Sequence, residues 1–218
     1  MADTDTLPLY PTTSPEVFRD PGATVALFAP VFDRLASLVE VDAALLDAPT
    51  PCRGFTVAAL QRHVLAWLQF FAAALQDPDA TAPRLDPEAW ELGQGDRPAA
   101  IVTRAAEGIA RAVTGGVAGR LVVMSQARMA GDGVLAMALG EYLVHGWDLA
   151  RATGREYDAD DDAGEAALTF LQGMVAPEHR GPDSGFFDAE VPAAPGATAF
   201  ERLLCFAGRH PDWAPEQG

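Results

Sequence analysis

The chain has 218 residues, the length of a single domain that can build a substantial core without disulfides or other cross-links. Hydrophobic residues make up 49% and charged residues 21%, which is typical of a globular protein and excludes a disordered one. All 15 basic residues are arginine and the formal net charge is −16, so the composition argues against binding to nucleic acid or to an anionic membrane surface.

The predicted elements are almost all helices. Residues 1–21 contain prolines and no clear period, which predicts an irregular arm before a single domain over 22–218. Apolar residues at helical spacing predict six helices, at 22–39, 56–75, 98–113, 134–152, 163–175 and 199–207. Residues 120–124 fit a short strand or an extended linker, and acidic residues 77–96 fit a long surface loop. No βαβ pattern occurs, so we expect an all-α fold, a four-helix bundle with additional short helices.

The sequence gives no indication of a membrane span, a signal peptide or a reactive cysteine. No apolar run reaches the roughly 18–20 residues that a transmembrane helix needs, and the first residues are acidic, unlike a signal peptide. We therefore expect a cytoplasmic protein with no membrane partner. Cys52 and Cys205 form no metal-binding motif and no disulfide framework, and neither has the sequence context of a reactive thiol.

Two histidines and a glutamate form the candidate functional site. Glu141 and His145 are four residues apart and project from one face of the 134–152 helix, which is apolar on nearly every side. A neighbouring helix that brings His63 to that face would complete a set of two histidines and one carboxylate, which leaves coordination positions open as catalytic metal sites do. The alternatives are a helix-surface Glu/His pair and a core histidine among Leu60, Val64 and Trp67.

Three separated blocks resemble one known family. The residues are Thr50-Pro-Cys-Arg-Gly-Phe-Thr-Val57, Glu141-Tyr-Leu-Val-His-Gly-Trp-Asp-Leu-Ala-Arg-Ala-Thr-Gly154 and Arg202-Leu-Leu-Cys-Phe-Ala-Gly-Arg-His-Pro-Asp-Trp213. They look like the actinobacterial metal-binding proteins of the DinB-like superfamily, relatives of the N-terminal domain of mycothiol-dependent maleylpyruvate isomerase. The resemblance implies a four-helix bundle that holds a divalent metal, often zinc, on residues matching His63, Glu141 and His145. Phe55 stands where the family usually has Trp, and the isomerase carries a further C-terminal domain, so its own reaction does not carry over.

The resemblance and the open metal site together suggest a thiol-dependent transferase or isomerase. Zinc would hold the thiolate of a small-molecule thiol, mycothiol by the resemblance, which attacks a small electrophile. The alternatives are a metal-dependent hydrolase and a non-enzymatic metal-binding module. A homodimer is also left open.

Residues around the site have weaker claims. Trp67, Trp147 and Arg151 are the candidates for cofactor binding, with Phe71 in the same pocket wall, although aromatic residues at this spacing are more often plain core. Asp148 is expected either as a hydrogen-bond acceptor from a ligand histidine or as an exposed helix-end charge. Arg209 is taken as a substrate-carboxylate binder or, by default, a solvated side chain. We assign no role to His179 or His210.

Overall fold

The computed structural model describes residues 7–10, 12, 14–181 and 187–215, and they form a helical molecule. Its α-helices are α1 (Pro21–Leu38), α2 (Val57–Gln76), α3 (Pro98–Thr114), α4 (Gly131–Ala152), α5 (Asp161–Met174) and α6 (Ala199–Phe206). Short 3₁₀ helices lie at η2 (Glu16–Arg19), η3 (Ala43–Leu45), η4 (Val117–Gly119) and η5 (Pro177–His179), and the strands are β1 (Leu121–Val123) and β2 (Arg128–Ala130). The predicted all-α class is confirmed.

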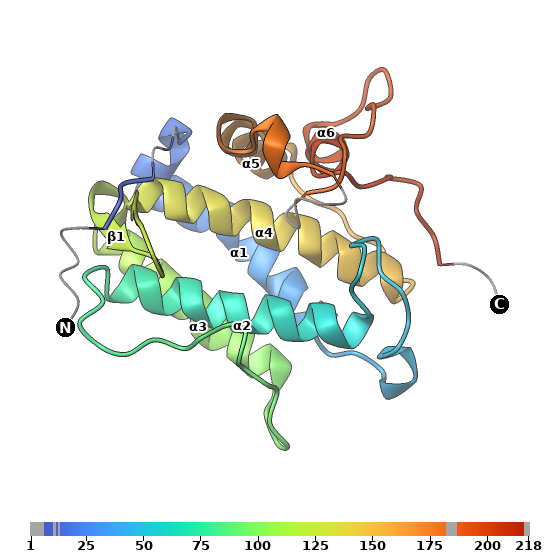
Figure 1. Ribbon diagram of the computed structural model, residues 1–218, viewed down its shortest axis with the longest axis horizontal. Helices are drawn as coiled ribbons and strands as arrows, with labels where there is room; N and C mark the ends of the chain where they lie inside the picture. Colours follow the sequence, from blue (N-terminus) through green and yellow to red (C-terminus); the bar gives the residue numbers. More distant parts are fainter. Residues whose placement is uncertain (1–6, 11, 13, 182–186, 216–218) are drawn as a thin grey trace.

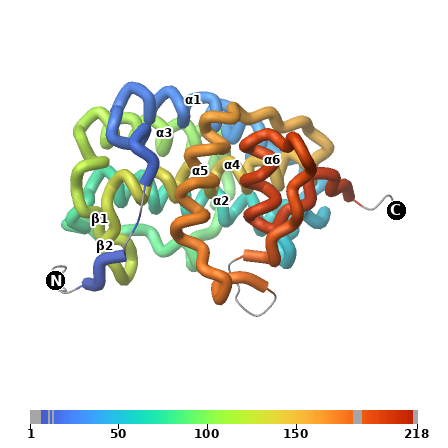
Figure 2. Tube along the Cα trace, turned by 90° about the horizontal axis from the view of Figure 1, so that it is seen from above, coloured from blue at the N-terminus to red at the C-terminus, as the bar shows by residue number. Residues whose placement is uncertain are grey.

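Helices α1 to α4 form the bundle. Both α1 and α2 pack against α3 and against α4, so the four helices enclose one core. Figure 1 shows α4 running alongside α2 with α1 behind them, and α5 and α6 on the side of α4 away from α2. Helices α5 and α6 pack on each other and α5 packs on α4, which the view from above in Figure 2 also shows. No helix among the described residues is long and apolar enough to cross a membrane.

Helix α4 is the central element because it has neighbours on almost every side. Most of its residues are buried, among them Leu139, Tyr142 and Leu143 at 0% exposure. The residues that keep partial exposure are Met137, Glu141, His145 and Arg151. The first three are spaced by four, so they lie along one stripe of the helix. The central helix therefore reaches solvent mainly along the stripe that carries the candidate ligands.

Local sequence explains where the helices begin. Thr56 is the N-cap of α2, and its side chain accepts a hydrogen bond from the backbone N–H of Ala59 at 3.3 Å. Asp20 caps α1 in the same way, and Pro21 opens that helix. In α6, Thr198 and Glu201 form a complete capping box. The cap at Thr56 fixes the start of α2 and so the height of His63 along the bundle.

The structure differs from the prediction mainly at one end of the bundle. Helix α4 begins at Gly131, three residues before the predicted start. Gly131 and Gly133 lie within the helix and allow its first turn to pack closely against Val117 and Thr12. A Cβ at Gly131 would lie 2.0 Å from the carbonyl oxygen of Val117. The predicted strand pairs antiparallel with β2, which the sequence did not indicate, and Leu9 of the N-terminal arm bridges to Arg128. The first six residues of the arm lie outside the described residues.

Candidate metal centre

The three predicted ligands come together between α2 and α4. His63 Nε2 lies 2.9 Å from Glu141 Oε1, and His145 Nε2 lies 3.5 Å from the same oxygen. The two imidazole rings are 5.2 Å apart between centroids. The side chains of His63 and Glu141 are about a quarter exposed, at 24% and 26%, and that of His145 is 12% exposed. Two nitrogens thus converge on one carboxylate at a point that solvent can reach.

Glu141 is held as a carboxylate. Burial raises its pKa, but the neighbouring His145 and the hydrogen bond and charge of His63 outweigh that effect and bring the pKa below its ordinary value. An ionised carboxylate beside two imidazole nitrogens is a donor set that suits zinc and related divalent ions. Within the described chain, His63, Glu141 and His145 form one of two groups of side chains close enough to share an ion. The residues therefore fit the metal that the sequence suggests.

Asp148 orients His145 from behind. Its Oδ2 lies 2.9 Å from His145 Nδ1, and the carboxylate is completely buried. A proton on Nδ1 donated to this carboxylate leaves Nε2, the nitrogen that faces Glu141, with its lone pair free. Of the two predicted roles for Asp148, the hydrogen-bond acceptor agrees with the structure and the exposed helix-end charge is wrong.

Arg209 is the residue whose place the sequence analysis missed. It lies just beyond α6 and is 5% exposed, so the default of a solvated arginine is wrong. Its Nη2 donates to Asp148 Oδ2 at 2.8 Å, its Nε lies 3.1 Å from Oδ1, and its Nη1 donates to the carbonyl of Ala207 at 2.9 Å. Burial alone would raise the pKa of Asp148, but Arg209 and His145 together lower it. The available signal was Asp148 itself, since a carboxylate in so apolar a helix needs a buried partner.

Of the aromatic residues predicted to wall the pocket, Trp67 lies beside the candidate metal ligands and Trp147 does not. The Trp67 ring centroid is 6.2 Å from that of His63, and Phe55 meets His63 edge-on at 5.3 Å. Trp147 is buried at 5% exposure and projects from nearly the opposite side of α4 to His145, being two residues further on. Arg151 donates from Nε to the Trp213 carbonyl at 2.9 Å. The roles of Trp67, Trp147 and Arg151 in cofactor binding stay predictions.

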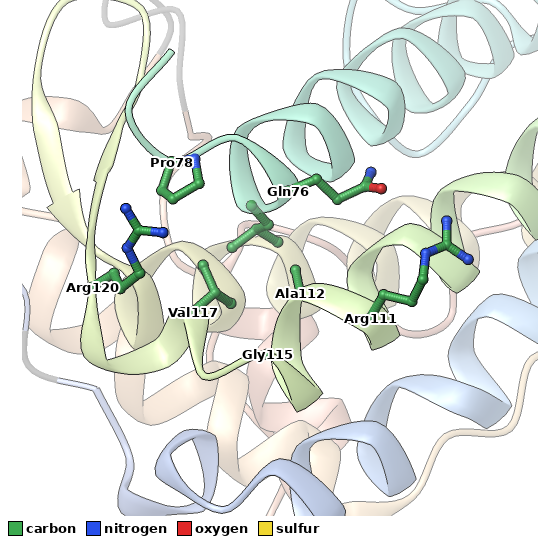
Figure 3. A pocket seen from close by; sticks show the side chains of 8 residues that line it. Gln76, Pro78, Arg111, Ala112, Gly115, Val117 and Arg120 are labelled. Atoms are coloured by element: carbon green, nitrogen blue, oxygen red, sulfur yellow. The ribbon is translucent and has the colours of Figure 1, made fainter. Parts of the chain in front are cut away.

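Two cavities lie at the other end of the bundle from the ligands. One, of about 300 Å³, lies between the C-terminal ends of α2 and α3, and its lining includes Gln76, Arg111 and Arg120 (Figure 3). The other, of about 420 Å³, lies beside η2 and the start of α4. Neither is lined by His63, Glu141 or His145. These cavities therefore do not extend the candidate metal centre.

The fold and the candidate metal centre define a class of protein: a helical bundle in which two histidines and one glutamate meet between two helices. Comparison with known proteins specifies it further. Residues 28–150 match the model of the mycothiol maleylpyruvate isomerase N-terminal domain, and the chain belongs to that family. The matched range includes all three candidate ligands, whereas Arg209 lies outside it.

Among individual proteins, the chain is similar to two from Mycobacterium tuberculosis, one from strain CDC 1551 and one from strain H37Rv, both described as uncharacterized. Each is 28% identical over 179 residues, which cover 80% of this chain and 90% of the relative. No solved structure matches the chain significantly. These relatives are consistent with the family assignment, and their descriptions name no activity.

Proposed function

We propose that this protein binds a divalent metal, zinc foremost, on His63, Glu141 and His145 and uses it in a thiol-dependent transfer or isomerisation. The observation that carries the proposal is the convergence of His63 Nε2 and His145 Nε2 on Glu141 Oε1. Asp148 supports it, because the hydrogen bond to Nδ1 commits His145 to presenting Nε2. The name of the family suggests mycothiol as the thiol.

The chain's own residues prepare the site but supply no sulfur nucleophile for a substrate. A bound zinc ion would lower the pKa of a coordinated thiol, so that the thiol is ionised at neutral pH. Cys205 is buried in α6, and burial raises the pKa of Cys52 to about 12, which keeps that thiol protonated when no metal is bound. The reacting sulfur would therefore arrive with the cofactor. Phe55 and Trp67 form an apolar surface beside His63 against which a small electrophile can lie.

Metal analysis of purified variants tests the ligand set. The wild-type protein should hold about one divalent ion per chain, and His63→Ala and His145→Ala should each lose most of it. His210→Ala is the matched control, since His210 is exposed and outside both candidate ligand groups, and it should keep the ion. Full occupancy in both ligand variants would show that the three side chains form only a hydrogen-bonded polar cluster.

Calorimetric titration of mycothiol into metal-loaded and metal-stripped protein then tests the reaction class. Binding that requires the metal supports thiol chemistry on a small electrophile. Absence of binding, combined with hydrolysis of activated esters that Glu141→Gln abolishes, would favour a metal-dependent hydrolase. If neither thiol binding nor hydrolysis is found, the protein is a metal-binding module without catalysis.

A further inference from the structure

The two candidate histidine ligands differ at the ring nitrogen that does not face Glu141. His145 Nδ1 lies 2.9 Å from Asp148 Oδ2, so a buried carboxylate occupies this side of its ring. His63 also presents Nε2 to Glu141, but its Nδ1 has no hydrogen-bond partner within the described part of the chain. This Nδ1 is also not among the buried side-chain atoms that lack a partner, so solvent reaches it. One histidine is therefore held from behind, and the other has a ring nitrogen without a protein partner.

Aromatic rings lie on either side of the His63 ring. Phe55 meets it edge-on with 5.3 Å between centroids, and Trp67 lies tilted to it at 6.2 Å. The buried guanidinium behind the centre, that of Arg209, is committed to Asp148 and cannot hold a second carboxylate. A molecule that bonds to His63 Nδ1 would therefore meet apolar surfaces. Such surroundings suit a neutral acceptor better than a charged one, because burying an unpaired charge is costly.

Metal binding at Nε2 fixes what Nδ1 can do. A neutral imidazole that gives the lone pair of Nε2 to an ion carries its proton on Nδ1, and Nδ1 is then a hydrogen-bond donor. Ligand histidines usually donate this N–H to a carboxylate, a backbone carbonyl or water. The acceptor for His145 is Asp148, whereas the described residues provide no acceptor for His63. The N–H of His63 is therefore available to a molecule that binds at the metal.

We propose that the Nδ1–H of His63 binds the thiol that reaches the metal, by donating a hydrogen bond to a neutral carbonyl oxygen of that thiol. This inference rests on the proposed function and adds a substrate class to it: thiols that carry a carbonyl several bonds from the sulfur. With a Zn–N distance of about 2.1 Å and a hydrogen bond of about 2.9 Å, the carbonyl oxygen lies roughly 7 Å from the ion, across the His63 ring. The sulfur takes an open position on the ion, so the molecule is held at both ends.

Genetically incorporated Nδ-methylhistidine tests the inference, because the methyl group removes the N–H and leaves Nε2 able to bind the ion. Protein with His63→Nδ-methylhistidine should keep its zinc. By calorimetry it should bind N-acetylcysteamine, a thiol with a carbonyl, about two- to tenfold more weakly than the wild type, the effect of one lost hydrogen bond. The affinity for n-pentanethiol, which has a matched chain and no carbonyl, should not change. His145→Nδ-methylhistidine is the matched control, and it should weaken zinc binding by about 10–100-fold because the methyl group blocks the bond to Asp148.

Nuclear magnetic resonance of the zinc-loaded wild-type protein gives a second readout that needs no variant. The nitrogen-15 resonance of His63 Nδ1 should shift when N-acetylcysteamine binds, because the N–H gains an acceptor. It should shift much less when n-pentanethiol binds. Equal shifts with the two thiols would contradict the hydrogen bond.

The outcomes separate this inference from the proposed function. Unchanged binding of N-acetylcysteamine by the His63 variant would overturn the donor role and leave the metal site intact. Equal weakening of both thiols would also overturn it, because the methyl group would then act through its bulk. Loss of zinc from the His63 variant would overturn it too, since Nδ1 would not be open to solvent. If the wild-type protein binds zinc but neither thiol, the inference and the thiol-dependent function fail together.

Discussion

Asp148 and Arg209 form an ion pair that is almost completely removed from water, and the pair sits directly behind a candidate ligand. Their side chains are 0% and 6% exposed, and the guanidinium contacts both carboxylate oxygens. Such a pair can contribute little net stability when intact, but removing one partner leaves an uncompensated buried charge. Its value in this protein is the orientation it gives His145.

Arg209→Met should therefore destabilise the protein strongly. We expect a loss of about 3–5 kcal/mol in the free energy of unfolding, because Asp148 would remain charged and buried. Urea denaturation measures this loss. Arg202→Met is the control, since Arg202 pairs with Glu165 on the surface and should cost under about 1 kcal/mol. Equal losses in the two variants would contradict the importance of the buried pair.

The pH dependence of stability should carry the signature of Asp148. Its pKa is lowered in the folded protein, so the stabilisation is fully present above the unfolded value of about 3.9 and is lost as the pH falls through the folded value. The free energy of unfolding, measured by urea titration at several pH values below about 5, should fall with pH. Asp148→Asn should flatten that slope, whereas Asp33→Asn, on an exposed part of α1, should leave it unchanged.

Individual residues also show what sequence can and cannot reveal. The spacing of Glu141 and His145 predicted a shared helix face because helical geometry fixes it locally. The contact of Arg209 with Asp148 joins positions 61 residues apart, and no period or motif encodes such a pairing. The proximity of Cys52 to His145 was missed for the same reason, since a loop of irregular backbone sets it.

At the scale of elements, glycines decide how closely α4 approaches its neighbours. The predicted fourth helix began at residue 134, whereas α4 begins at Gly131. In the structure, the backbone of Gly131 lies against η4, where no side chain would fit. The six helices were otherwise located to within a few residues, because apolar periodicity is strong over long segments. The missed strand β2 has three residues, too few to show a period.

Gly131→Ala should be destabilising although alanine favours helices. The added Cβ would lie 2.0 Å from the Val117 carbonyl oxygen, so α4 or η4 must move. Gly173→Ala in α5 is the matched control, because a Cβ there meets nothing within 4 Å and should stabilise by about 0.5–1 kcal/mol. Thermal unfolding of both variants measures the difference. A gain in stability for Gly131→Ala would disprove the close contact.

For the whole molecule, the proposed metal site predicts that added metal raises the stability of the folded protein. An ion that binds only the folded protein should raise the free energy of unfolding by about 2.7 kcal/mol at a free concentration 100 times its dissociation constant. Denaturation of metal-stripped protein with and without added zinc measures this gain. His145→Ala should abolish it and His210→Ala should retain it. An undiminished gain in His145→Ala would place the ion elsewhere.

The position of Arg209, 61 residues after Asp148, has a consequence for synthesis. The residues of the bundle and all three candidate ligands leave the ribosome well before Arg209 does, since α4 ends at Ala152. Until the segment beyond α6 is released, Asp148, which accepts the hydrogen bond of His145, lacks its buried cationic partner. A nascent chain can thus bring the four bundle helices together before Asp148 acquires the buried partner that neutralises its charge.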